Sequence, residues 1–99
     1  MTINQNREDA KLTFAIEGRI DTKTSPELEN ALRTSLTEDI QELVFDLAET
    51  VYISSAGLRI FLIAQKQMNR QGTMKVIHVN EDLMEIFEVT GFTDILTIA

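Results

Sequence analysis

The segment from Val44 to Leu62 constrains the fold of this 99-residue chain more than any other. A compact run at Leu43 to Leu47 is apolar at four of its five positions. A polar break at Ala48 to Thr50 follows, then a short β-prone piece at Val51 to Ile53, and then Ser54 to Gly57 at the start of an apolar stretch. This order predicts a buried strand, a short loop and a helix whose first turn carries two hydroxyl groups.

The two serines at the start of that helix have two interpretations. A helix N-terminus leaves N–H groups unpaired and carries a partial positive charge, so it stabilises an anion without a dedicated basic side chain. Ser55 is therefore either a cap or the acceptor of a phosphate that acts as a switch, although a serine at this position is most often only an N-cap. Position alone leaves Ser54 open as the modified residue, with Thr50 as a weaker third candidate.

The composition is that of a globular protein without disulfide bonds. Hydrophobic residues make up 43% of the chain, and it contains no cysteine, which excludes thiolate metal sites. This length predicts one domain spanning residues 1–99. The N-terminal MTINQNREDAK has no apolar stretch behind its charges, and no run approaches the roughly 20 apolar residues of a membrane span. We therefore expect a cytoplasmic protein without membrane insertion.

The net charge indicates the class of partner. A formal net charge of −7 argues against nucleic-acid binding, because neutralising phosphates requires clustered Lys and Arg. The partners are therefore expected to be proteins.

Strands and helices are expected to alternate along the chain. Period-2 alternation from Leu12 to Glu17 predicts a strand that ends at Gly18. Thr24 or Ser25 is expected to cap a helix reaching about Leu36, with Glu27 completing a capping box at Thr24. The later elements are a strand at Leu43–Leu47, a helix at about Ala56–Asn69 with Ile63 widening its apolar stripe and Gly72 stopping it, a strand at Met74–Val79, a helix at Glu81–Val89 and an edge strand at Ile95–Ile98. Together they predict an α/β fold with a mixed four- to five-stranded β-sheet and helices packed against it.

Three segments, in this order, match the pattern of one known family. GRIDTKTSPEL, Gly18 to Leu28, resembles an early Gly-x-x-Asp…Thr loop, and FDLAETVYISSAGLRIFL, Phe45 to Leu62, matches an Asp-Leu…Ser-x-Gly-Leu pattern. LMEIFEVTGFTDIL, Leu83 to Leu96, is similar to a final helix with a Thr-Gly turn. On these motifs the chain resembles a STAS domain of the anti-sigma factor antagonist type. The resemblance covers essentially the whole chain and implies a STAS-like single domain.

The resemblance implies a phosphorylation switch at Ser55. In that family, the serine two residues before the motif glycine is phosphorylated by a partner anti-sigma factor, a GHKL-type serine kinase. Gly57 is that glycine here, so Ser55 is the matching serine. Binding of the antagonist to the anti-sigma factor releases a sigma factor, and a serine phosphatase stays open as a second partner. This sequence departs from many members by having Ser54 in place of an acidic residue, and from some by having Ala56 in place of a second hydroxyl.

Residues around the acceptor are expected to form the partner-binding surface. Asp21 in the first loop either contributes to the kinase contact or caps local backbone. Arg59 could meet an acidic partner surface, but an exposed helical arginine needs no special role. The full expected set is Asp21, Thr22, Thr24, Ser54, Ala56, Gly57, Leu58 and Arg59. Phosphorylation would add about −1.5 to −2 charges at one spot and is expected to cause little refolding.

The residue patterns argue against catalysis. A serine hydrolase elbow requires Gly-x-Ser-x-Gly, and Ile53 occupies the first glycine position of the frame around Ser55. Ser55, His78 and Asp46 form a triad only on paper, since nothing in the sequence supports its geometry and His78 is expected within a strand. A single histidine and scattered carboxylates give no metal-ligand spacing, and there is no glycine-rich phosphate loop. We expect no enzyme activity, no metal and no cofactor.

The competing interpretation is a non-phosphorylated STAS accessory subunit of a bacterial lipid-transport complex. Such a subunit would use the helix after Ser55 as a docking face without a phosphate cycle. The match at Ser55 favours the switch, whereas Ser54 in place of an acidic residue favours the accessory subunit. A kinase and a phosphatase encoded beside this protein would support the switch, and a transporter permease would support the alternative.

Overall fold

The computed structural model describes all 99 residues. The strands are β1 (Thr2–Glu8), β2 (Lys11–Ile20), β3 (Glu42–Asp46), β4 (Thr50–Ile53) and β5 (Thr73–Ile77). The helices are α1 (Ser25–Ser35), α2 (Ser55–Gln71) and α3 (Glu81–Val89), followed by a 3-10 turn, η1, at Phe92–Asp94. The prediction of an α/β fold with a mixed sheet is confirmed, and the sheet has five strands.

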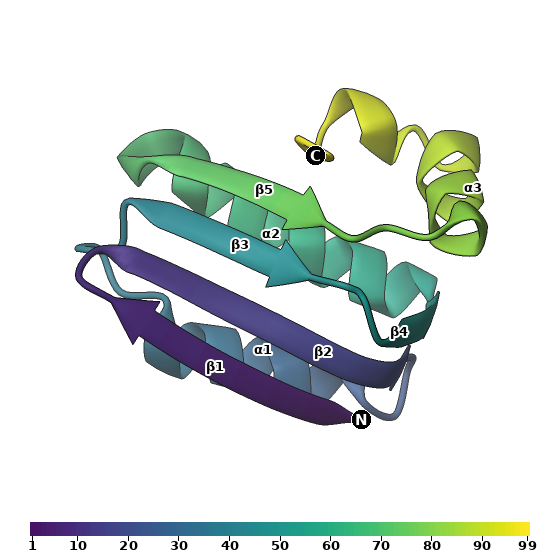
Figure 1. Ribbon diagram of the computed structural model, residues 1–99, viewed down its shortest axis with the longest axis horizontal. Helices are drawn as coiled ribbons and strands as arrows, with labels where there is room; N and C mark the ends of the chain where they lie inside the picture. The colour runs from purple at the N-terminus through teal and green to yellow at the C-terminus, as the bar shows by residue number, and fades with distance from the viewer.

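Strand β2 organises the sheet (Figure 1). It pairs with β1 in antiparallel fashion, and it pairs in parallel with β3 over its first half and with β4 over its second half. Strand β5 continues the parallel part on the far side of β3. Because the carboxyl ends of parallel strands meet at one edge of the sheet, the chain segments leading into α1, α2 and α3 all leave from that edge.

Strand β2 does not end at Gly18, as the sequence predicted. Gly18 has a φ of +99°, which glycine adopts without strain, and the pairing with β4 shifts register between Gly18 and Arg19. The Gly18 N–H donates to the carbonyl of Glu49 at 2.9 Å. This bulge lets β2 pass from β3 to β4, so Ile20 comes to lie opposite Ile53 directly before α2.

The sequence analysis did not predict strand β1. Its residues pair with β2 from Thr2 opposite Glu17 to Glu8 opposite Lys11. Only Ile3 within it is partly buried, and the remaining side chains are exposed. The strand is therefore held by its backbone ladder rather than by burial, which leaves no apolar alternation for sequence analysis to detect.

The expected edge strand at Ile95–Ile98 is reduced to a single bridge. After η1, Ile98 forms one isolated parallel bridge with Val76, and the Val76 N–H donates to the Thr97 carbonyl at 2.9 Å. Strand β5 also ends earlier than predicted, at Ile77. The cause is His78, which follows the strand with a φ of +58° in the left-handed region and so cannot continue it.

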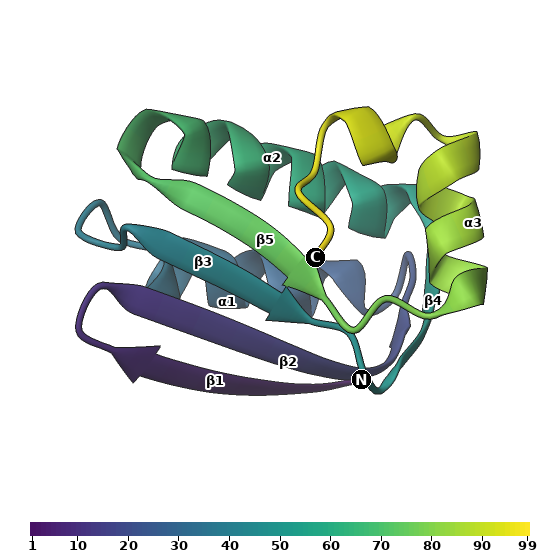
Figure 2. The ribbon, with the colours of Figure 1, turned by 45° about the horizontal axis from the view of Figure 1, so that its top comes forward.

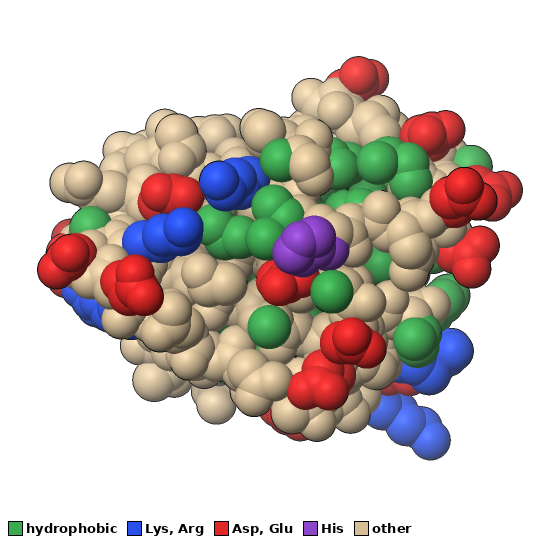
Figure 3. All heavy atoms as spheres, viewed as in Figure 1, with side chains coloured by type: hydrophobic (Ala, Val, Ile, Leu, Met, Phe, Trp, Pro, Cys, Tyr) green, Lys and Arg blue, Asp and Glu red, His purple; other side chains and the backbone are tan.

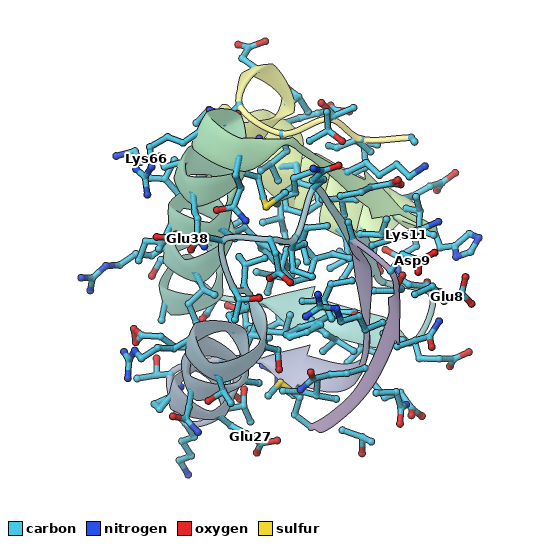
Figure 4. All side chains as sticks on the ribbon, turned by 90° about the vertical axis from the view of Figure 1, so that its left-hand side faces the viewer. Glu8, Asp9, Lys11, Glu27, Glu38 and Lys66 are labelled. Carbon is cyan, nitrogen blue, oxygen red and sulfur yellow. The ribbon has the colours of Figure 1, made fainter.

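Helices α1 and α2 cover one face of the sheet, and α3 lies at the end of the sheet beside β4 (Figures 1 and 2). Side chains fill the space between sheet and helices, whereas Glu27 and Lys66 point outward (Figure 4). Phe14, Phe45, Phe61 and Phe87 form an edge-to-face chain through the core, with successive ring centroids 5.9, 4.6 and 6.4 Å apart. Ile63, predicted to widen the apolar stripe of α2, is 49% exposed instead.

The opposite face of the sheet carries no helix and is largely polar (Figure 3). Glu42 lies between Lys11 and Lys75, with its Oε2 at 3.9 and 3.7 Å from their Nζ atoms. Exposed ion pairs of this kind contribute little to stability. They add charged side chains to a face of the sheet that no helix covers.

Candidate functional site

The candidate site is the start of α2, where the chain leaves β4. Ser54 is the N-cap, and its Oγ accepts the Gly57 N–H at 3.3 Å. The Ser54 N–H donates to the Ile20 carbonyl at 2.8 Å, which fixes the helix start to the end of β2. Ser55, the first helical residue, is exposed, and its hydroxyl makes no hydrogen bond within the protein. Ser54 therefore caps the helix, whereas the neighbouring Ser55 exposes its hydroxyl to solvent.

Thr50, the third hydroxyl considered, is unsuited to modification. It is only 1% exposed, and its Oγ1 donates to the buried carbonyl of Ile16 at 2.7 Å. A kinase could not reach this oxygen without opening the β2–β4 pairing. The structure therefore overturns Thr50 as a candidate acceptor.

The loop between β2 and α1 is closed by its own hydrogen bonds. Asp21 Oδ1 accepts the N–H groups of Lys23 and Thr24, each at 3.0 Å. The hydrogen bond from the Thr24 N–H is the main reason that the pKa of Asp21 lies below its ordinary value. Asp21 thus caps local backbone, which is one of its two predicted roles.

Thr24 does not form the predicted capping box. It is the N-cap of α1, but its hydroxyl makes no hydrogen bond to the N-terminal N–H groups of that helix. Thr24 Oγ1 instead accepts the Asp21 N–H at 2.8 Å and donates to the Arg19 carbonyl at 2.8 Å. The Thr24 hydroxyl therefore closes the loop, and the capping box that was predicted between Thr24 and Glu27 does not form.

The loop and the start of α2 come together at a shallow hollow of about 150 Å³. Thr22 and Pro26 contribute one wall, and Ala56 and Arg59 contribute another. Three predicted partner-binding residues therefore line this one place: Thr22, Ala56 and Arg59. Pro26 was not predicted as part of it, because only the packing of α1 beside α2 brings Pro26 there.

Gly57 and Leu58 lie beneath the site rather than on its surface. A Cβ on Gly57 would lie 2.7 Å from Cγ2 of Ile20 and 3.0 Å from Cγ2 of Ile53. Leu58 is 6% exposed and belongs to the core. Their side-chain positions are therefore closed in the folded chain, and the partner-binding role that the sequence analysis assigned to these two residues stays a prediction.

Arg19 and Tyr52 add a feature that the sequence analysis missed. The Arg19 guanidinium carbon lies 4.4 Å from the centre of the Tyr52 ring, and its Nε lies 3.7 Å from Asp21 Oδ2. The pairing of β2 with β4 places Arg19 opposite Tyr52. Because the two residues are far apart in sequence, only that register reveals the contact.

Asp46 and His78 form a hydrogen-bonded pair, with Oδ1 and Nδ1 2.8 Å apart. Partial burial acts to raise the pKa of Asp46, but hydrogen bonds from His78 and from the Ala48 N–H outweigh it and lower the pKa. Ser55 makes no hydrogen bond to this pair. His78 lies on the face of the sheet shown in Figure 3, whereas α2 covers the other face, so the pair does not extend to a catalytic triad.

The structure contains neither a cluster of metal-ligating side chains nor a membrane-spanning helix. No three His, Cys, Asp or Glu side chains gather closely enough to hold a metal ion. None of the helices combines the length and apolar character that crossing a membrane requires.

Comparison with known proteins gives a consistent result. The STAS domain model matches residues 2–99. The Anti-sigma-B factor antagonist of Bacillus subtilis is 32% identical over 98 residues, covering 98% of this chain and 87% of that protein.

Two solved structures share the fold. An anti-sigma-factor antagonist (STAS) domain protein from Planctomyces limnophilus superposes with a TM-score of 0.86 at 12% identity, covering 98% of this chain and 87% of that chain. The Bacillus cell fate determinant SpoIIAA in its phosphorylated form superposes with a TM-score of 0.76 at 10% identity, covering 99% of this chain and 91% of that one.

Proposed function

Because this chain belongs to the STAS domain family, we propose that it is an anti-sigma factor antagonist controlled by reversible phosphorylation of Ser55. In this proposal, the unmodified protein binds an anti-sigma factor with serine kinase activity and thereby releases a sigma factor. The assignment to Ser55 rests on the different environments of the three candidate hydroxyl groups. Ser54 Oγ caps α2 and Thr50 Oγ1 is buried, whereas the Ser55 hydroxyl is exposed and unbonded.

The modification is a phosphoryl transfer to Ser55. The Oγ of Ser55 attacks the γ-phosphorus of a nucleoside triphosphate held by the kinase. A new O–P bond forms, the bond to the nucleoside diphosphate breaks, and the hydroxyl proton passes to a base of the kinase. In this chain Asp21 Oδ1 accepts two backbone N–H groups and Oδ2 lies near Arg19, so the base is assigned to the partner.

The phosphate would act at the surface. It adds about −1.5 to −2 charges and three acceptor oxygens at an exposed helix start. Release of a partner by a factor of about 10³ requires about 4 kcal/mol. A dianion pressed into an apolar or acidic partner surface, which offers it no counter-charge, supplies an effect of this size.

The test is intact-mass measurement and site mapping after expression in the native host, for the wild-type protein and for Ser55→Ala and Ser54→Ala. We expect a phosphate on Ser55 in the wild type and in Ser54→Ala, and none in Ser55→Ala. Candidate anti-sigma kinases from the same genome are then added singly with ATP. Binding to one of them should be strong before phosphorylation and at least a hundredfold weaker after it.

Two outcomes would overturn the proposal. A phosphate that remains in Ser55→Ala and disappears in Ser54→Ala would move the switch to the capping serine. A protein that stays unmodified in several growth conditions, yet co-purifies with a transporter permease, would support the lipid-transport accessory subunit instead.

A further inference from the structure

Arg59 is the charged residue of the site that the proposed switch leaves unexplained. Three of the five arginines make ion pairs, namely Arg7 with Asp39, Arg19 with Asp21 and Arg33 with Glu29. Arg59 is exposed and makes none. It borders the hollow between α1 and the start of α2. An arginine without an ion pair therefore lies one helical turn after the exposed serine.

The helix places these two side chains on the same face. Arg59 follows Ser55 by four residues in α2, so the two are neighbours on the helix surface. Helical side chains lean toward the N-terminus, which directs the long arginine side chain back over the turn that begins with Ser55. Arginine also suits a phosphate better than lysine does, because its planar group donates two parallel hydrogen bonds.

The other charges nearby, apart from Lys23, already have partners. Glu29 borders the same hollow, but its carboxylate lies 3.7 Å from Arg33. Asp21 is held by backbone N–H groups of its own loop, and Arg19 is paired with Asp21 and stacked on Tyr52. Lys23, in the exposed loop, is the remaining cation of this region without an ion pair.

We propose that Arg59 is the internal counter-ion of a phosphate on Ser55, and that this pairing withdraws the guanidinium from the partner-facing surface. The inference rests on the proposed role of Ser55 as the acceptor. Before modification, Arg59 offers an unpaired cation to an acidic group of the anti-sigma factor. After modification, the phosphate places negative charge in the interface, and its pairing with Arg59 removes the contact between Arg59 and the partner. Both effects weaken binding.

The first experiment needs no kinase. Phosphoserine is incorporated at position 55 during synthesis, and the phosphate is titrated by ³¹P NMR in this protein and in its Arg59→Gln form. We expect the second pKa of the phosphate, ordinarily about 6, to be lower with Arg59 present by about 0.2 to 0.4 of a unit, the size of an exposed i,i+4 pair. Arg70→Gln removes the same charge from the last turn of the same helix and should leave the titration unchanged.

Equal titration curves for the parent and Arg59→Gln would overturn the pairing. If Arg70→Gln changed the phosphate pKa as much as Arg59→Gln does, the effect would come from net charge and not from a specific pair. A larger change in Lys23→Gln would identify Lys23 in the loop as the counter-ion. Because the phosphate is installed during synthesis, these results stand whether or not a kinase exists.

The second experiment measures binding of the unmodified protein to the anti-sigma factor identified by the kinase assay. Arg59→Gln should weaken it by up to about fivefold, as expected for an exposed charge contact, while Arg70→Gln should not. If Arg59→Gln bound with unchanged affinity, Arg59 would not contact the partner, and the proposal that phosphorylation removes this contact would be wrong.

Discussion

Substitution of Gly57 by alanine tests how the position of Ser55 is fixed. Gly57 lies two residues after Ser55, where α2 rests on the ends of β2 and β4. The added Cβ would lie 2.7 Å from Cγ2 of Ile20, 3.0 Å from Cγ2 of Ile53 and 3.3 Å from the Ile20 carbonyl oxygen. Ile20 and Ile53 are fully buried, so neither side chain has free space to move into.

Two opposing effects decide the result. Replacing glycine by alanine favours a helix by up to about 1 kcal/mol, and by less in the first turn. Overpacking a filled core costs about 1 to 3 kcal/mol. We therefore expect Gly57→Ala to lower the free energy of unfolding by about 1 to 2 kcal/mol. In a domain of this size, each kcal/mol corresponds to roughly 4 to 8 °C in Tm.

The assay is urea unfolding of a double-mutant cycle with Ile20→Leu. Leucine keeps the volume of isoleucine but lacks the Cγ2 methyl group that the new Cβ would meet. The double variant should therefore be more stable than the sum of the two single effects predicts, by at least about 0.5 kcal/mol. Ser55→Ala, at an exposed position of the same turn, should not destabilise the protein. Additive effects, or a Gly57→Ala protein as stable as the wild type, would refute the close-approach argument.

The cap of α2 and the loop before α1 each stabilise the fold through one side chain, Ser54 and Asp21. Ser54→Ala should cost about 1 kcal/mol in urea unfolding through loss of the N-cap, whereas Ser54→Asn, which can still cap, should recover most of it; equal losses would argue against capping. Asp21→Asn keeps the Oδ1 acceptor but cannot ionise. Because the folded pKa of Asp21 is lowered, its ionisation stabilises the fold above about pH 4, and this contribution is lost as the pH falls through the folded pKa. The unfolding free energy of Asp21→Asn should therefore fall less steeply below about pH 4 than that of the wild type, and parallel curves would contradict this.

The elements that bury apolar residues could be predicted from the sequence. The apolar run at Leu43–Leu47 overlaps β3, which spans Glu42–Asp46, and the helix before Gly72 is α2. Helix α3 runs from Glu81 to Val89, as predicted. In each case the burial of a periodic apolar set determines the local structure, so the pattern is visible in the residues themselves.

The parts that were missed depend on long-range pairing or on backbone conformation. Strand β1 is polar and exists through its ladder with β2, and Gly18 continues its strand because β4 pairs beyond it. His78 ends β5 through a left-handed backbone that residues other than glycine adopt only occasionally. At the site, the motif indicated Ser55. Only the hydrogen bonds of the folded chain show that the hydroxyls of Ser54 and Thr50 are already bonded, whereas that of Ser55 is not.

The arrangement around Ser55 explains how a phosphate could alter binding without altering the fold. The start of α2 is held from below by the close contact of Gly57 and from the side by the bond between the Ser54 N–H and the Ile20 carbonyl. The favourable contact between a phosphate and the helix dipole is worth only about 0.3 to 1 kcal/mol, which is too little to displace such a packed element. In the proposed switch, a change of about 4 kcal/mol in partner affinity would therefore arise at the interface, where the new charge meets the partner. A rigid helix start serves this purpose better than a mobile loop, because a dianion that cannot move aside cannot avoid the partner surface.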